Sequence, residues 1–285
     1  MPEERKVVIV TDSTCDLTDE QLKEFGIRWV PLRIVCQNAE YRDRVELHHD
    51  DIYAILATEL PKTSLPLPED VIALYDELAA DGVTDVVHLS ISSGLSGTFN
   101  MVRMIAEDYQ GRMDVRVVDS KTLSSGLGMM VLAAAHAMRE GATPEEIVEA
   151  AMAVRRSQLS VFVIRTLEFL RKGGRIGLVE GVMGNLLQIK PIILVNDDGI
   201  YETLTKARGY KSAVEAMANE TLKKFGQAKI NLSVVQGRAM EEAQQLLQKL
   251  KSSLNVADST ISSVSPVLAI HTGPGLLGII ANKVE

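Results

Sequence analysis

The stretch DVVHLSISSGLSGTFNMVRMIAED, residues 85–108, decides the fold class of this 285-residue chain. Its first seven residues, Asp85–Ile91, are mostly aliphatic and predict a buried strand. A loop of serines and glycines follows, and the residues from Gly97 to Asp108 have a helical pattern. The stretch therefore predicts a strand, a loop and a helix in succession, which is the unit from which parallel sheets are built.

The same succession recurs through the first half of the chain. Thr18 and Gln21 form a capping-box pattern that opens a helix closing near Gly26, and Thr143 with Pro144 supplies an N-cap and a proline at the first helical position. Further elements are expected at Lys6–Thr11, Arg28–Val35 and Val115–Val118 (strands) and at Pro68–Ala80 and Ser124–Arg139 (helices). This alternation predicts an α/β fold with a mostly parallel sheet covered by helices on both faces.

The pattern changes after about Ser157, where a glycine-rich basic segment follows at Arg171–Gly177. Beyond it we expect strands at Ile192–Asn196, Ile200–Ala207, Lys229–Val235 and Val267–His271, and helices near Gly209–Phe225 and Met240–Leu254. The sequence therefore predicts an N-terminal α/β lobe at 1–158, with a Ser/Gly anion-binding loop, and a second α/β lobe at 159–285.

Composition narrows the function classes. A formal net charge of −8 disfavours binding to nucleic acid or to anionic membrane surfaces. Cys15 and Cys36 lie in no zinc or disulfide pattern, which indicates a reducing compartment. The N-terminus lacks the features of a signal peptide, and the longest apolar stretch, Gly126–Met138, is too short to span a bilayer. We expect a cytoplasmic protein without integral membrane association.

Two hydroxyl-rich segments are candidates for ligand binding. Ser92–Thr98 lies between a strand end and a helix start, where open α/β sheets bind carboxylates or phosphates, although a simple N-capped loop explains it equally well. Pro61–Pro66 is a proline-bracketed turn containing Thr63, which taken alone indicates plain turn chemistry. Neither segment identifies a ligand without further context.

A literal GxGxxG match at Gly273–Gly278 does not indicate a dinucleotide site. It ends seven residues before the end of the chain, which leaves no room for the following helix, strand and acidic residue of that fingerprint. His271 precedes the match and is as consistent with a structural role as with ligand contact. The sequence also lacks a P-loop, so we expect no ATP site in this chain.

Other features favour structural roles. Cys15 has no identifiable basic partner, so a small buried residue explains it better than a nucleophile does. Asp12, at the end of the first predicted strand, lacks a paired acid that would support a metal site or a general base. Eleven methionines and 4% aromatic residues describe a flexible aliphatic interior, which could line an alkyl tunnel but also fits an ordinary core.

Eight segments occur in a fixed order over nearly the whole chain: TDSTCDL (11–17), PKTS (61–64), ISSGLSGT (91–98), VDSK (118–121), LRKGGRI (170–176), GNLLQIKP (184–191), KARG (206–209) and HTGPG (271–275). Together they resemble the DegV family. The resemblance implies a two-lobed α/β protein that buries one long-chain fatty acid and has no metal or other cofactor. It further implies that a separate ATP-binding fatty acid kinase subunit phosphorylates the bound carboxylate, so that this chain is a carrier rather than an enzyme.

The resemblance also implies roles for particular residues. Thr63, Ser93 and Ser96 are the expected carboxylate ligands, and Arg208 and His271 are expected near the headgroup. The chain departs from the family where Leu65 and Leu67 replace the usual Gln and Ser after the Thr-Ser turn, and where FNMV (99–102) replaces the usual Tyr-Gln-Ser-Ala. These departures bear on the preferred acyl chain and on the contact with the kinase.

Two other functions compete with this interpretation. The substrate-binding subunit of a dihydroxyacetone-type kinase resembles this fold, and there a histidine holds a small polar substrate covalently. A regulatory role on nucleic acid is disfavoured by the net charge, since Arg171, Lys172 and Arg175 form the only basic cluster in their segment.

Overall fold

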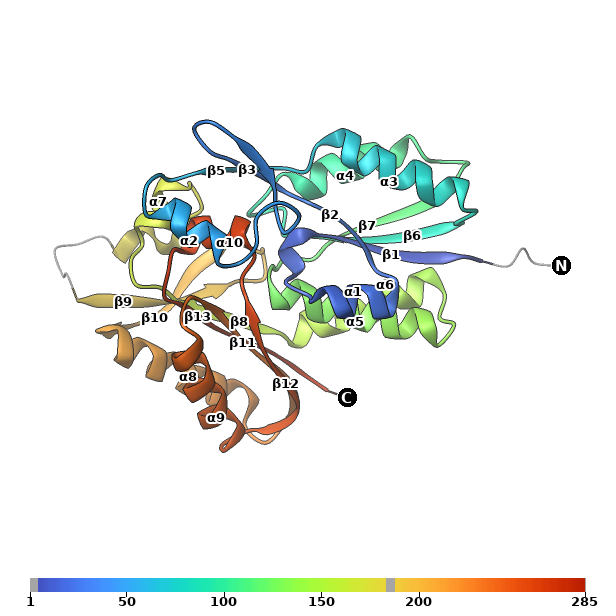
Figure 1. Cartoon of the computed structure of the whole chain (residues 1–285). Helices are drawn as coiled ribbons and strands as arrows, with labels where there is room; N and C mark the ends of the chain where they lie inside the picture. The colour runs from blue at the N-terminus through green and yellow to red at the C-terminus, as the bar shows by residue number, and fades with distance from the viewer. Residues whose placement is uncertain (1–4, 183–187, 285) are drawn as a thin grey trace.

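The computed structural model describes residues 5–182 and 188–284, and its first part forms a four-stranded parallel sheet. The strand order is β2 (Arg28–Val30), β1 (Val7–Asp12), β6 (Asp85–Ser90) and β7 (Asp114–Asp119). Figure 1 shows α3 (Pro68–Ala80) and α4 (Thr98–Glu107) on one face and α1 (Asp19–Phe25), α5 (Ser125–Arg139) and α6 (Pro144–Ser157) on the other. Ile9 and Val10, adjacent in β1, enter the two opposite cores, as strand geometry requires. The predicted parallel sheet with helices on both faces is confirmed.

Helix ends in this part follow the capping signals of the sequence. The Thr18 hydroxyl accepts a hydrogen bond from the Gln21 amide at 3.2 Å, and the Gln21 side chain accepts one from the Thr18 amide at 3.0 Å. Gly26 ends α1 with a φ of 64°, a conformation that glycine adopts without strain. Thr143 caps α6 in the same reciprocal way. Within the described residues, no helix combines the length and hydropathy needed to cross a membrane.

The second part is a six-stranded mixed sheet. Its order is β10 (Tyr201–Arg208), β9 (Ile189–Val195), β8 (Leu159–Val163), β13 (Leu276–Lys283), β11 (Lys229–Gly237) and β12 (Asn255–Ser263), and only the β11–β12 pair is parallel. The helices α8 (Tyr210–Phe225) and α9 (Met240–Lys251) pack on one face. The chain passes from α6 to β8 at Gln158, and the division into two lobes at residue 158 stays a prediction.

A small antiparallel sheet and several short helices complete the fold. The sheet has the order β4 (Glu40–Arg42), β3 (Arg33–Val35) and β5 (Lys62–Ser64). The short helices are η1 (Ser13–Cys15), α2 (Asp51–Leu56), α7 (Glu168–Lys172), η2 (Gly177–Val182) and α10 (Pro266–Thr272). α10 contacts α2, α7 and β5, which are far apart in the sequence (Figure 1). The small sheet, α2, α7, η2 and α10 pack against the face of the six-stranded sheet that lies opposite α8 and α9.

The predicted strand at Val267–His271 is wrong, because these residues belong to α10. Pro266 occupies the first helical position, where its missing N–H costs nothing. The Asp16 carboxylate accepts a hydrogen bond from the Ser265 amide at 2.9 Å, and the Asp43 carboxylate accepts one from the Val267 amide at 3.1 Å. Two buried aspartate side chains from distant segments therefore accept hydrogen bonds at the start of a helix whose local composition favours a strand.

The predicted strand at Arg28–Val35 is divided between two sheets. β2 ends at Val30 and β3 begins at Arg33, and Pro31 between them has no N–H to join a ladder. The sequence patterns also did not predict β4, β8, β12, β13, α2, α7 or the short helices η1 and η2. The segment Pro61–Pro66, expected to be a turn, contains the strand β5. Residues 184–187 of the segment GNLLQIKP lie outside the described residues.

Candidate functional site

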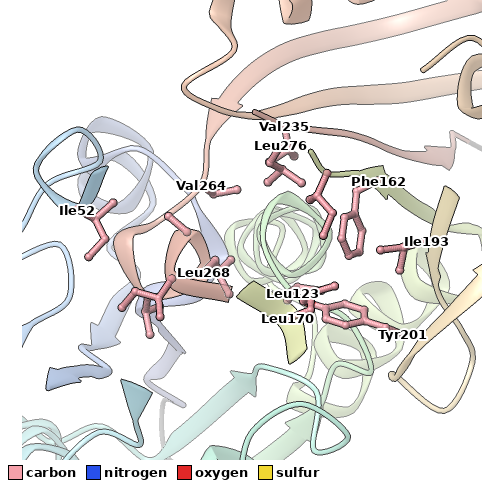
Figure 2. Close-up of a cluster of buried hydrophobic side chains, with 14 of the residues drawn as sticks. Ile52, Leu123, Phe162, Leu170, Ile193, Tyr201, Val235, Val264, Leu268 and Leu276 are labelled. Carbon is pink, nitrogen blue, oxygen red and sulfur yellow. The ribbon is translucent and has the colours of Figure 1, made fainter. Parts of the chain in front are cut away.

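A cavity of about 270 Å³ lies where the small sheet and α10 face the six-stranded sheet. Its wall is mostly apolar and includes Phe162 of β8, Val235 of β11 and Leu268 of α10. These side chains belong to one buried cluster, and Figure 2 shows Phe162, Val235 and Leu276 grouped on one side of it. The cavity can therefore accommodate an apolar group out of contact with water.

The cavity wall also carries polar side chains. Thr63 of β5 and His271 of α10 are 208 residues apart in sequence, yet Thr63 Oγ1 lies 2.9 Å from His271 Nε2. Ser96 and Arg175 also line the cavity, and all four residues are partly exposed, whereas Phe162 and Val235 are buried. The four partly exposed polar residues therefore mark the mouth. The buried part of the wall is mainly apolar and also includes Thr14, Ser124, Ser160 and Thr272.

His271 is neutral at ordinary pH. Burial, and secondarily the positive charge of Arg175, lower the pKa of His271 from 6.5 to about 4. Its Nδ1 is buried and has no hydrogen-bond partner among the described residues. A neutral imidazole beside a threonine hydroxyl provides donors and acceptors without adding a charge.

Arg175 supplies the positive charge at the mouth, although it was not among the site residues predicted from the sequence. Its Nε donates to the Leu95 carbonyl at 3.3 Å and its Nη1 donates to the Gly173 carbonyl at 2.8 Å. Both acceptors are neutral carbonyl oxygens, so these hydrogen bonds do not offset the positive charge of the guanidinium next to the cavity. Arg175 belongs to the segment LRKGGRI (170–176), one of the eight that resemble the DegV family, so its place in that segment could have indicated a role in the site.

Ser93 and Ser96 have different surroundings. Ser96 lines the cavity, and its hydroxyl accepts from the Thr98 amide at 3.3 Å and lies 2.9 Å from the Thr98 hydroxyl. The Ser93 amide donates to Asp119 at 3.0 Å and its hydroxyl accepts from Lys121 at 3.0 Å. Ser93 is not among the described residues that line the cavity.

Arg208 lies away from the cavity mouth. It is the last residue of β10, its side chain is exposed, and its Nε donates to Gln188 at 3.0 Å. The structure therefore brings Thr63, Ser96 and His271 to one cavity, together with Arg175, and leaves Ser93 and Arg208 outside the described lining.

Asp12 and Cys15 occupy structural positions. The buried Asp12 carboxylate accepts from the Thr14 amide at 3.0 Å and from the Ile91 amide at 2.8 Å, so it ties the end of β1 to the start of the serine loop. Burial raises the pKa of the Cys15 thiol to about 12, which keeps the thiol protonated and unreactive.

Comparisons with known proteins agree with this architecture. A family model described as an uncharacterised protein of the DegV family matches residues 6–284. A DegV domain-containing protein of Clostridium perfringens is 38% identical, over 98% of this chain and 99% of its own length. A DegV family protein from Thermus thermophilus, described by its fatty acid binding, has a TM-score of 0.91 at 34% identity, with 98% of this chain and 100% of that chain covered.

Two further solved structures are similar over nearly their whole length. DegV of Bacillus subtilis, a fatty acid binding protein, has a TM-score of 0.88 at 26% identity and covers 99% of this chain and 100% of its own. A stearic-acid-binding protein of Eubacterium ventriosum has a TM-score of 0.88 at 26% identity and covers 98% of both chains. The proteins that share this fold thus include several described as binding fatty acids.

Proposed function

This chain belongs to the DegV family, and from that premise we propose that its cavity binds one long-chain fatty acid. The observation that carries the proposal is the union, in one cavity, of a polar mouth and a buried apolar interior. The carboxylate lies at the mouth with Thr63, Ser96, His271 and Arg175, and the alkyl chain extends along the wall formed by β8, β11 and β13.

The alkyl chain supplies most of the affinity. Burying roughly 15 methylene groups at about 0.8 kcal/mol each gives a gross driving force near 12 kcal/mol before the costs of ordering. The headgroup contacts then need only satisfy the carboxylate. The Thr63 and Ser96 hydroxyls can donate to it, and Arg175 balances its charge.

The carrier presents the carboxylate to a separate ATP-binding kinase subunit. In that reaction a carboxylate oxygen attacks the γ-phosphorus of the partner's ATP, an acyl phosphate forms and ADP leaves. Support comes from the partly exposed mouth and from the absence of a P-loop in the sequence. Arg208 is an exposed residue at the end of β10 and does not line the described cavity. We therefore assign it to contact with the partner rather than with the carboxylate.

Lipid analysis of purified protein tests the proposal. The chain is expressed in a bacterial host and extracted with organic solvent, and mass spectrometry of the extract is expected to show a long-chain fatty acid at about one equivalent. Folded protein that yields no such acid and takes up neither added palmitate nor oleate contradicts the proposal. Binding of a triose instead supports the dihydroxyacetone-kinase alternative, which the apolar wall disfavours.

A further inference from the structure

The run Gly273–Gly278 contains three glycines, and the structural requirement for glycine differs among these positions. Gly273 ends α10 with a φ of 68°, and Gly275 has a φ of 84°. A Cβ at residue 273 would stand 2.4 Å from the Phe169 ring, and one at residue 275 would stand 2.5 Å from the Arg165 side chain. Backbone conformation and close packing therefore account for the first two glycines.

Gly278 is different, because neither reason applies to it. It lies inside β13, a central strand of the six-stranded sheet, with no positive φ. A Cβ on it would have its three nearest neighbours at 3.3 to 3.6 Å, all in the two flanking strands, so a methyl group would fit after a shift of a few tenths of an ångström. Glycine in a strand interior weakens the strand and often marks a place where a ligand approaches closely.

The register of the sheet places Gly278, with its missing side chain, in the wall of the cavity. Leu276, Gly278 and Ile280 alternate along β13 and all line the cavity, whereas Leu277 and Ile279 pack in the opposite core. Across the strands, Gly278 pairs with Val235 of β11 and with Phe162 of β8. Figure 2 shows Val235 and Phe162 within the buried cluster. The missing side chain thus leaves a shallow groove between two cavity-lining side chains.

From this geometry we infer that Gly278 determines acyl-chain selectivity, because the alkyl chain crosses the sheet in the groove between Val235 and Phe162. The inference rests on the proposed fatty-acid function. The preferred ligands are then fatty acids whose alkyl chain is long enough to extend from the polar mouth past Gly278. A side chain at this position fills the groove and excludes the distal methylene groups, while a shorter acid, which ends before the groove, keeps its contacts.

The test compares the affinities of stearate and decanoate for delipidated protein by displacement of a fluorescent fatty acid. Gly278→Ala is expected to weaken stearate binding about tenfold, the scale for roughly two methylene groups losing apolar contact, and to change decanoate binding by less than about twofold. Gly278→Val is expected to widen the difference. The melting temperature of Gly278→Ala should equal or exceed that of the parent, since alanine suits a strand better than glycine.

Two further variants make the result specific. In the double variant Val235→Ala and Gly278→Ala, the smaller side chain at 235 leaves space beside the added methyl group. This variant is expected to restore stearate affinity. Ile279→Val alters the same strand on the face away from the cavity and is expected to leave the stearate-to-decanoate ratio unchanged. Equal losses for both acids in Gly278→Ala, or no loss for either, overturn the inference. Parent protein that binds neither acid overturns the proposed function itself.

Discussion

The imidazole of His271 packs directly over Gly173, so closely that a Cβ on residue 173 would lie 2.2 Å from His271 Nδ1. The backbone of Gly173 is helical, with φ −77° and ψ −7°, so an alanine there would be strained mainly by the imidazole and, less, by the Phe169 carbonyl oxygen, 3.0 Å from the added Cβ. α7 thereby fixes the position of a histidine on α10, and the histidine in turn meets Thr63 of β5.

Gly173→Ala is expected to displace His271 and to weaken fatty-acid binding by about 1–3 kcal/mol, the scale for losing a hydrogen-bond partner of a charged group. The measurement is a double-mutant cycle with His271→Ala, scored by the dissociation constant for palmitate. In the His271→Ala background the alanine at 173 meets only the Phe169 carbonyl oxygen and should weaken binding less than it does in the parent. Additive losses would show that Gly173 acts on binding by another route.

Thr63→Ala and Ser96→Ala are each expected to lower palmitate affinity by about 1–3 kcal/mol without lowering the melting temperature, because each removes a hydroxyl from the cavity mouth. Thr63→Ser, which keeps the hydroxyl, should retain most of the affinity. Ser93→Ala serves as the matched control, since the Ser93 hydroxyl contacts Lys121 and does not line the described cavity. A larger loss in Ser93→Ala than in Ser96→Ala contradicts this assignment.

Arg208→Ala is expected to keep the palmitate affinity of the parent and to lose acyl-phosphate formation when the acyl-loaded protein is mixed with the ATP-binding subunit, because the side chain is exposed and away from the cavity. Steady-state phosphorylation and a direct binding assay are measured on the same preparation. Lys206→Ala, an exposed cation on the same strand, is the control and should turn over normally. Parent-like turnover in Arg208→Ala removes this residue from the partner contact.

Asp43 is expected to make stability depend on pH. Burial raises the pKa of its carboxyl from 3.8 to about 7, opposed by hydrogen bonds from Ser13 and the Val267 amide and by the charge of Arg44, and reinforced by Asp16. An acid with a raised pKa binds its proton more tightly in the folded chain. Its contribution to stability is therefore complete below pH 3.8 and is lost as the pH rises through about 7.

Asp43→Asn removes this titration and keeps an oxygen for the Val267 amide, so its stability relative to the parent should rise by a few kcal/mol between pH 4 and pH 8, at about 1.4 kcal/mol per pKa unit. Urea denaturation of both proteins at the two pH values measures the difference. Glu46→Gln is the control, because Glu46 is a surface carboxylate whose pKa is lowered by its hydrogen bond from the Arg42 amide. A parallel pH profile for Asp43→Asn and the parent contradicts the prediction.

Local signals in the sequence were sufficient for the first sheet. Strand-loop-helix units such as residues 85–108 combine a buried aliphatic run with helix caps a few residues away, and local preferences agree there with the tertiary environment. The capping box at Thr18 and the N-cap at Thr143 formed as predicted for the same reason. The eight ordered segments also sufficed to identify the family.

The tertiary structure alone decided the features that depend on distant partners. Val267–His271 has the composition of a strand, yet Asp16 and Asp43, more than 200 residues away, supply the helix caps. Thr63 and His271 meet only because β5 and α10 pack together, and Arg175 reaches the mouth from a loop. Sequence alone determined which segments carry hydroxyls, charges and glycines, because these follow from residue types. The folded chain decided which of them share a cavity, because that depends on packing between elements distant in sequence.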